Sequence, residues 1–400
     1  MGATVSTAGA GVSALLLGLL LTEPLRRLAL RHGITDRPSA RKAHTRPTPY
    51  LGGVAVAAAT LAAGGTAALA GDVLDPVLGV LLGGAALMCV LGLIDDLRPL
   101  APALRLCVET SAAVVVVLTG GHPDVFGGAW DAALAVAWIV FLTNAFNLLD
   151  NTDGVASSLC VVIGGFLCLT APAGGSDGPG VVVAALAGAC LGFLFHNRHP
   201  ARIFLGDAGS LSLGFTLASV MVVRYDDVQG PAGPVSLLLA TLVPTLDTTL
   251  VVLSRYRESR PVTQGGTDHI AHRLRRLGLS VPQVVRCLAL FTLAGCVSAV
   301  LVTHGRLDPG VALGSACVVG ACAVRLLLGV PATGATAPGG AVPRATPTAG
   351  IARLVPQLRP AGAYGHRHRT VRQPPLPRSR EAGRKDGRLS AGTGAPITSK

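Results

Sequence analysis

Five short polar clusters interrupt an otherwise apolar chain, and their residue types suit phosphoryl transfer. Carboxylates can hold a divalent cation, amides can bind a nucleotide, and imidazoles and cations can neutralise phosphate oxygens. If the clusters meet at one membrane face, they provide such a site. They are residues 41–44, 95–96, 144–154, 204–210 and 268–273.

Two of the clusters are built around aspartates. Asp95 and Asp96 follow an apolar run. Adjacent carboxylates repel each other unless Mg²⁺ or a basic side chain neutralises them, although a charged helix end that stops a membrane span also explains the pair. Asp207 lies among glycines. It is either a Mg²⁺ ligand where a phosphate can approach the backbone, or an ordinary residue of a helix start.

The other clusters combine amides, imidazoles and cations. Asn144, Asn147 and Asp150 are spaced by three, which keeps them near one face of a helix, and Asp153 follows. His269 and His272 are also three apart. The pair can hold phosphate oxygens or form solvated surface, and Zn²⁺ is disfavoured because no third soft ligand is near. The basic residues before the second apolar run suit a lipid phosphate, or merely set orientation: Arg41, Lys42, His44 and Arg46.

The composition indicates a membrane protein, so membrane-spanning helices must position these clusters. Half of the 400 residues are hydrophobic and 14% are charged, against about a quarter in soluble domains. We predict an all-α, polytopic helix bundle with about eleven transmembrane helices. Asp247 and Glu109 lie inside apolar runs, so we expect them to face the bundle interior. The spans are placed near 8–30, 51–70, 77–94, 103–119, 130–149, 155–172, 181–195, 209–223, 234–253, 283–303 and 309–330.

The distribution of basic residues predicts the orientation. Alternate connections between these spans hold eighteen Lys and Arg in one set, but only Arg224 and Arg306 in the other. By the positive-inside rule, the N-terminus is outside, the C-terminus is cytoplasmic and every cluster faces the cytoplasm. We therefore expect a multi-pass protein of the plasma membrane.

The chain divides into a transmembrane domain, residues 1–330, and a basic Pro/Gly/Arg-rich tail, residues 331–400. The tail holds 12 of the 33 Lys and Arg residues. We predict that it is disordered, because it has little apolar surface to bury. Attraction to anionic lipids or a simple linker role explains its charge better than a nucleic-acid partner does.

Taken in order, the clusters resemble the polyprenyl-phosphate N-acetylhexosamine-1-phosphate transferase family (glycosyltransferase family 4). The match runs from about Asp36 to Gly278, including an Asp-x-Pro…Arg-Lys-x-His…Pro-x-Pro-x-x-Gly-Gly entry. Asn151 replaces the usual Gly between the signature aspartates, and Ala271 replaces a His. Arg273-Leu274 looks more like the N-acetylglucosamine branch. The matched motifs are residues 36–53, 95–96, 144–154 and 206–210.

The resemblance implies that a polyprenyl phosphate attacks the β-phosphate of a UDP-N-acetylhexosamine, most simply UDP-GlcNAc, and releases UMP to start a cell-envelope polysaccharide. Mg²⁺ is the implied cofactor and Mn²⁺ the alternative ion; a homodimer is compatible with the sequence. The implied metal ligands are Asp207, Asn147 and Asp150; the catalytic residues are Asp95, Asp96, Asp150, Asp153, His269 and His272; the substrate-binding residues are Arg41, Lys42, His44, Arg46, Asn144, Asn147 and Arg273.

Three other functions remain open at this stage. One is the phospho-MurNAc-pentapeptide transferase reaction of peptidoglycan synthesis. A polytopic transporter would also have many spans, but transporter sites usually lie near the bilayer midplane. The changes at Asn151 and Ala271 would also fit a lipid-binding scaffold without activity.

Overall fold

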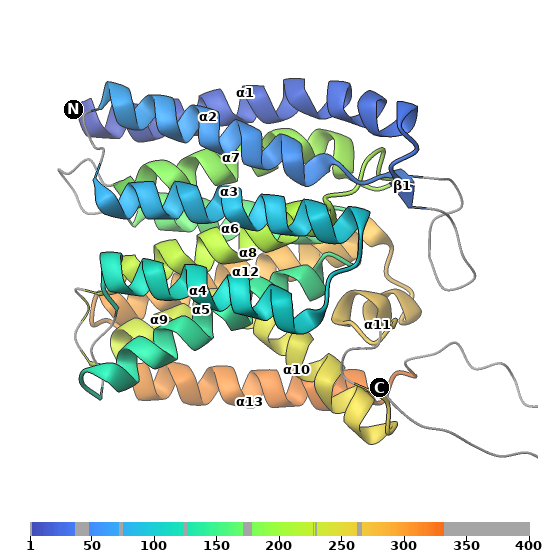
Figure 1. Cartoon of the computed structure of the whole chain (residues 1–400). Coiled ribbons are helices and arrows are strands. Elements are labelled where there is room, and N and C mark those ends of the chain that lie inside the picture. The colour runs from blue at the N-terminus through green and yellow to red at the C-terminus, as the bar shows by residue number, and fades with distance from the viewer. Residues whose placement is uncertain are drawn as a thin grey trace, which may run out of the picture. The chain divides into compact units, whose positions relative to one another are not determined.

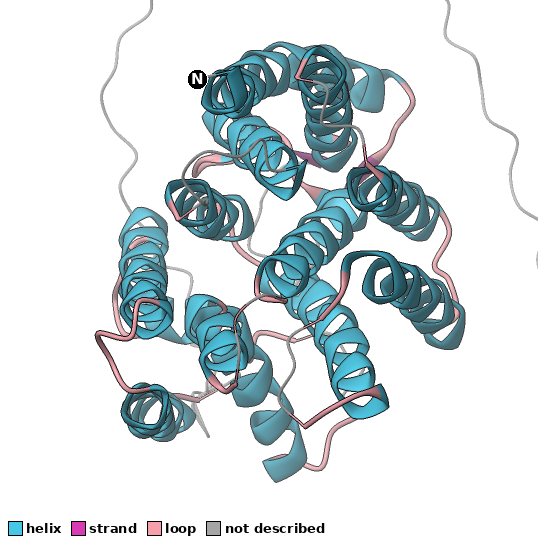
Figure 2. Cartoon of the chain, turned by 90° about the vertical axis from the view of Figure 1, so that its left-hand side faces the viewer, coloured by secondary structure: helices cyan, strands magenta, loops and turns pink. Residues whose placement is uncertain are grey.

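The computed structural model describes residues 2–36, 48–71, 75–122, 126–170, 178–226, 228, 230–261 and 266–331. Helices dominate this part of the chain, and most of them run alongside one another as a bundle (Figure 1; Figure 2 shows it end-on). The helices are α1 (Gly2–Arg31), α2 (Gly52–Ala70), α3 (Pro76–Leu97), α4 (Pro102–Gly120), α5 (Ala129–Leu149), α6 (Val155–Leu169), α7 (Gly178–Asn197), α8 (Gly206–Arg224), α9 (Ala232–Ala240), α10 (Leu242–Arg257), α11 (Ile270–Arg276), α12 (Val281–Thr303) and α13 (Pro309–Leu328).

The polytopic membrane bundle predicted from composition is confirmed. Within the described residues, nine helices are long and apolar enough to cross a bilayer, and the bent pair α9/α10 makes up to ten. The remaining predicted span coincides with α6, a shorter apolar helix of 15 residues. Each of the eleven predicted apolar runs therefore corresponds to a helix or to the bent pair.

The predicted continuous span at 234–253 is instead broken. The axes of α9 and α10 differ by 71° across Thr241. Pro244 lies in the first turn of α10 and has no N–H, so it cannot donate to the carbonyl of Ala240 as a continuous helix requires. The break redirects α10 toward the end of the bundle where α11 lies (Figure 1).

Helix starts follow local sequence signals. The Asp75 side chain accepts a hydrogen bond from the Leu78 N–H at 2.6 Å, with Pro76 at the first helical position of α3. Asp308 caps α13 in the same way, and Ser280 forms a capping box with Gln283 at the start of α12. Such caps satisfy donors that have no partner inside the helix.

The core is centred on α8, in which 83% of the most apolar window is buried, more than in any other of the nine long helices. A short antiparallel pair, β1 (Thr35–Asp36) with β2 (Thr48–Pro49), lies beyond the ends of α1 and α2, at the same end of the bundle as α11 (Figure 1). Residues 37–47 between these strands and residues 332–400 of the tail lie outside the described residues, so the predicted tail boundary stays a prediction.

Candidate active site

One end of the bundle contains a cavity of 1240 Å³ that is lined by six of the fourteen predicted site residues. Its wall includes the end of α3, the loop after α5, the first turn of α8 and α11. Residues from four separated parts of the chain therefore meet there, as the sequence predicted. The predicted residues on the wall are Asp95, Asp96, Asp150, Asp153, Asp207 and His272.

Asp96 fixes the start of α8. Its carboxylate accepts hydrogen bonds from the backbone N–H groups of Asp207 at 3.0 Å and Ala208 at 3.1 Å. Gly206 before them has φ of +73°, and a Cβ there would lie 2.7 Å from Asp96 Oδ2. Glycine is thus required both by the backbone conformation and by the close approach. The positive end of the α8 dipole consequently points at this part of the cavity.

The side chain of Asp207 is held from two directions. Its Oδ1 accepts a hydrogen bond from Asn147 Nδ2 at 2.8 Å, and its Oδ2 lies 3.3 Å from Arg105 Nη1. Asn147 Nδ2 also donates to Ser210 Oγ at 2.9 Å. The Asn147 carboxamide therefore turns its NH₂ group toward α8, which leaves its carbonyl oxygen as a donor atom for a cation.

Arg105 joins two site carboxylates and was counted in the sequence only as a topology signal. Besides Asp207, its Nη1 lies 2.5 Å from Asp95 Oδ2, while Asp95 Oδ1 accepts from the Leu100 N–H. The guanidinium thus supplies one of the cations that the aspartate pair required. Its position on α4, ten residues after Asp95, has no motif that could have marked it beforehand.

Asp150 and Asp153 lie in the turn between α5 and α6. Asp150 is half-buried, and the loss of solvent, followed by the carboxylates of Asp207 and Asp96, raises its pKa well above the usual range. Such a carboxylate favours a proton or a cation beside it. Asp153 Oδ2 is 2.7 Å from His199 Nδ1 and accepts from the Ala201 N–H at 3.1 Å. His199 was not anticipated from the sequence.

His272 and His269 have different environments. His272 lines the cavity, and burial, followed by His269 and the neighbouring arginines, lowers its pKa to about 4. His269 is buried, with Nδ1 2.8 Å from Asp247 Oδ2. Asp247 Oδ1 also accepts the Ile270 N–H at 2.7 Å, so this carboxylate, expected to face the bundle interior, orients the start of α11.

Ala271, which replaces a histidine of the family motif, is not one of the residues that line the cavity. It is 1% exposed and belongs to a buried apolar cluster with Leu149, Val155 and Leu250. An imidazole at this position would have to enter the packed core. The substitution therefore lies in the packed core and not on the cavity wall, which His272 lines.

Three described residues that were predicted to bind substrate do not line the cavity: Asn144, Asn147 and Arg273. Of these, Asn147 contacts the lining residue Asp207. Asn144 Nδ2 donates to the buried Glu109 Oε2 and to the Val140 carbonyl, inside the bundle. Arg273 is 1% exposed and bonds to protein atoms through all three side-chain nitrogens. Four further predicted substrate-binding residues lie outside the described residues: Arg41, Lys42, His44 and Arg46.

The donor set at the cavity fits a hard divalent cation. Among the described residues, no three His, Cys, Asp or Glu side chains are grouped closely enough for an all-protein metal site. Mg²⁺ usually takes only one or two carboxylates and completes its octahedron with water and phosphate oxygens. The carboxylates of Asp207 and Asp150, with the carbonyl oxygen of Asn147, suit that mode better than they suit Zn²⁺.

The fold and the cavity define a multi-pass helical membrane protein with an acidic polar site at one end of its bundle. The sequence model described as glycosyl transferase family 4 matches residues 78–225. Three similar proteins support the same assignment. A Streptomyces coelicolor protein named as a glycosyltransferase is 41% identical over 300 residues, covering 74% of this chain and 70% of that protein.

The other two relatives carry more specific names. A Bacillus subtilis protein named as an undecaprenyl-phosphate N-acetylglucosaminyl 1-phosphate transferase is 32% identical, covering 72% of this chain and 83% of its own length. The decaprenyl-phosphate N-acetylglucosaminephosphotransferase of Mycobacterium tuberculosis is also 32% identical, covering 70% and 78%. The chain belongs to glycosyl transferase family 4, and the resemblance seen in its motifs is confirmed.

Proposed function

We propose that the protein transfers GlcNAc-1-phosphate from UDP-GlcNAc to a polyprenyl phosphate at the cytoplasmic face of the plasma membrane. A phosphate oxygen of the lipid forms a bond to the β-phosphorus of the donor. The bond between that phosphorus and the oxygen bridging to the α-phosphate breaks, and UMP leaves with the electron pair. The product is polyprenyl-diphosphate-GlcNAc.

The observation that carries this proposal is the meeting of carboxylates from α3, α8 and the turn after α5 with an imidazole from α11 around one cavity. The cavity lies at the end of helices apolar enough to span a bilayer. A water-soluble diphosphate and a lipid phosphate can meet only at such a boundary. The names of the relatives support the choice of acceptor and sugar.

Asp207, Asn147 and Asp150 are the proposed holders of Mg²⁺, with Mn²⁺ as the alternative ion. When bound, the ion would neutralise charge on the phosphate oxygens. Asp207 is the first of these ligands, because Asn147, Arg105 and the fixed start of α8 determine where its carboxylate lies. Burial, followed by the neighbouring carboxylates of Asp207 and Asp96, raises the pKa of Asp150, so a cation beside it would be favourable.

The aspartate pair and the cations are proposed to act on the two phosphate groups. Asp95, paired with Arg105, lies next to Asp207 and would orient the acceptor phosphate; Asp96 would act mainly through α8. Asp153, fixed by His199, would shape the nucleotide end of the cavity. His272 would meet the diphosphate, with His269 and Asp247 behind it.

The assay uses membranes that contain the protein, UDP-[³H]GlcNAc, Mg²⁺ and polyprenyl phosphate, and we expect a lipid-linked sugar and UMP. Asp207→Asn should insert normally and lose both products. Asp75→Asn is the matched control, because an amide oxygen can still cap α3 at the Leu78 N–H. Parental activity of Asp207→Asn would contradict the metal assignment.

Running UDP-GlcNAc, UDP-GalNAc and UDP-MurNAc-pentapeptide side by side decides the donor. A preference for the pentapeptide donor would replace the proposed sugar by that of peptidoglycan synthesis. A folded protein that turns over none of the three would support the inactive scaffold instead. Labelling of single introduced thiols near Asp95, Asp150 and Asp207 from the inside only would support the proposed cytoplasmic orientation.

A further inference from the structure

The helix that carries His272, α11, is too short to be stable without contacts to the rest of the protein. α11 contains only seven residues, Ile270–Arg276, and isolated helices this short are unstable in water. It follows a segment whose residues 262–265 lie outside the described residues. Contacts with the rest of the bundle must therefore determine where its imidazole lies.

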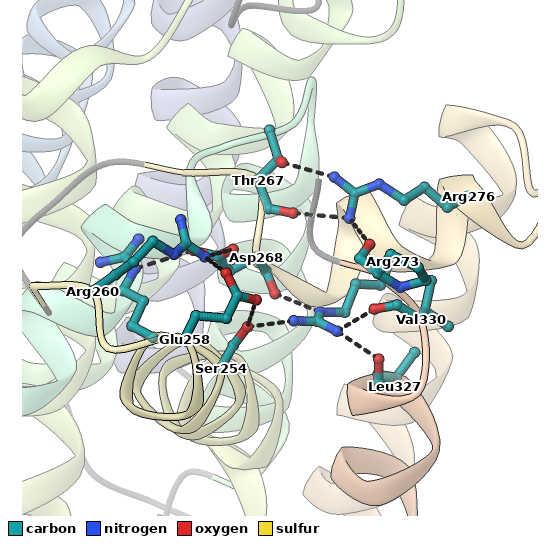
Figure 3. A network of polar contacts seen from close by, with 11 residues as sticks. Ser254, Glu258, Arg260, Thr267, Asp268, Arg273, Arg276, Leu327 and Val330 are labelled. Carbon is teal, nitrogen blue, oxygen red and sulfur yellow. Dashed lines mark hydrogen bonds and ion pairs between the residues drawn. The ribbon is translucent and has the colours of Figure 1, made fainter. Parts of the chain in front are cut away.

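Arg273 makes contacts of this kind in three directions (Figure 3). Its Nε donates to the Asp268 carbonyl at 2.9 Å, and its Nη2 donates to Ser254 Oγ of α10 at 2.6 Å. Its Nη1 donates to the carbonyl of Leu327 in the last turn of α13, at 2.7 Å, and to that of Val330, two residues after the helix ends. Since the side chain is 1% exposed, these partners replace water completely.

Arg276, one turn further along α11, repeats the contact at the same helix end. Its Nη1 donates to the Pro331 carbonyl at 2.8 Å. Its Nη2 donates to Thr267 Oγ1 at 2.7 Å, as Figure 3 shows. Val330 and Pro331 come just after α13, and the Val330 N–H bonds back to the Leu327 carbonyl at 2.9 Å. The two guanidinium groups therefore bind the C-terminal turn of α13 and the residues just after it, close to the negative end of the helix dipole.

Asp268 anchors the residues just before α11 to α10. Its carboxylate is 1% exposed and accepts from Arg260 Nη2 at 2.7 Å and Arg255 Nε at 3.1 Å. Burial alone would raise its pKa, but these two hydrogen bonds outweigh that effect and lower it. The carboxylate therefore stays ionised at neutral pH. The backbone carbonyl of Asp268 accepts the hydrogen bond from Arg273 Nε.

We propose that Arg273, assisted by Arg276, is a positioning residue that fastens α11 to the C-terminal end of α13 and so holds His272 at the cavity wall. This role takes the place of the substrate contact expected for Arg273, because all three of its side-chain nitrogens donate hydrogen bonds inside the protein. The inference rests on the proposed function only in that His272 meets the donor diphosphate.

The first test needs no substrate. Backbone hydrogen exchange of the full-length protein in detergent is compared with that of Arg273→Gln. We expect exchange to become about tenfold faster or more both in residues 270–277 and at the end of α13, because both segments lose their shared hydrogen bonds. Arg286→Gln is the control, since Arg286 is exposed and its Nε donates to the Pro282 carbonyl of its own helix, α12. Unchanged exchange in either segment of Arg273→Gln would overturn the proposal, whatever the reaction proves to be.

The second test separates positioning from direct contact with the donor. A displaced His272 should lower kcat/KM by about 10- to 100-fold, mainly through kcat, because small misplacements of a catalytic group are costly. Arg273→Lys should retain more of the parental kcat/KM than Arg273→Gln, but not all of it. One ammonium group cannot reach both the Asp268 carbonyl and the carbonyls at the end of α13. A rise in KM alone, with normal exchange, would show that Arg273 contacts the donor instead.

A milder variant keeps the proposal testable if Arg273→Gln fails to fold. Ser254→Ala removes one acceptor of the Arg273 guanidinium and leaves the carbonyls of α13 in place. We expect faster exchange in α11 from Ser254→Ala alone and no added effect of it in an Arg273→Lys background. Additive effects of the two changes would mean that the residues act independently and would contradict the shared contact.

Discussion

The carboxylate of Asp96, at the end of α3, caps the N-terminus of α8 through the backbone N–H groups of Asp207 and Ala208. Asp96, one residue of the aspartate pair, thus fixes the first turn of α8, which carries the proposed metal ligand Asp207. The role is positional, and it couples the stability of the fold to the geometry of the cavity.

Asp96→Ala should therefore lower both stability and activity. A lost N-cap acceptor costs about 0.5–2 kcal/mol, and the freed start of α8 would displace Asp207. Asp96→Asn should recover part of the stability, because its amide oxygen still accepts one N–H. Thermal midpoints in detergent and sugar-transfer rates provide the measurement. An Ala variant with the parental midpoint would mean that the two hydrogen bonds contribute nothing to the fold.

The sequence alone predicted the membrane spans and several cavity residues, but it did not predict residues and elements that depend on tertiary contacts. Long apolar runs predicted the spans, and residue types such as Asp95 and Asp207 predicted the cavity wall. Arg105 and His199 were missed, because no local motif marks either residue and two of their partners, Asp207 and Asp153, are 102 and 46 residues away along the chain. α11 was missed as a helix because tertiary contacts, not periodicity, hold its seven residues.

Arg105 lies between Asp95 and Asp207, so its removal should act on cation binding and catalysis in opposite directions. Without this positive charge, the carboxylates attract Mg²⁺ more strongly, and the Mg²⁺ concentration for half-maximal rate should fall. The rate itself should drop by about 100-fold, since the cation that fixes Asp95 and Asp207, the proposed phosphate- and metal-binding carboxylates, is lost.

Titrations of the transfer rate with MgCl₂ in Arg105→Gln and Arg105→Lys provide the comparison. Lysine keeps the charge and should retain the parental Mg²⁺ requirement more nearly than glutamine does. A higher Mg²⁺ requirement in Arg105→Gln would show that the arginine supports the ion rather than competing with it.

Gly53, at the start of α2, packs directly against the backbone of Gly209 and Ala208 in α8. A Cβ at this position would overlap Gly209 N, two residues from Asp207, so Gly53→Ala should destabilise the protein by about 1–3 kcal/mol and reduce activity. Gly65 lies on the same helix and a Cβ there would meet nothing within 4 Å.

Gly65→Ala is the matched control, because alanine is favoured over glycine inside a helix by up to about 1 kcal/mol. The two substitutions should therefore shift the thermal midpoint in opposite directions. Equal shifts would show that the contact between α2 and α8 is looser than the distances imply.

His272 should couple donor binding to proton uptake. Its pKa of about 4 in the free protein means that the imidazole is neutral at pH 7. A diphosphate placed beside it favours the charged form and raises that pKa. Donor affinity should therefore increase as pH falls from 7 toward 4, with up to one proton taken up per donor bound.

Calorimetric titrations near pH 6, in two buffers of different ionisation enthalpy, measure this uptake, and His272→Gln should reduce it. The unfolded-state pKa of histidine is about 6.5, so the unfolded chain binds more protons than the folded protein between pH 6.5 and 4. Without donor, His272 should thus make the protein less stable as pH falls through that window, and His272→Gln should flatten the decline. Equal proton uptake in the parent and in His272→Gln would place the titrating group elsewhere.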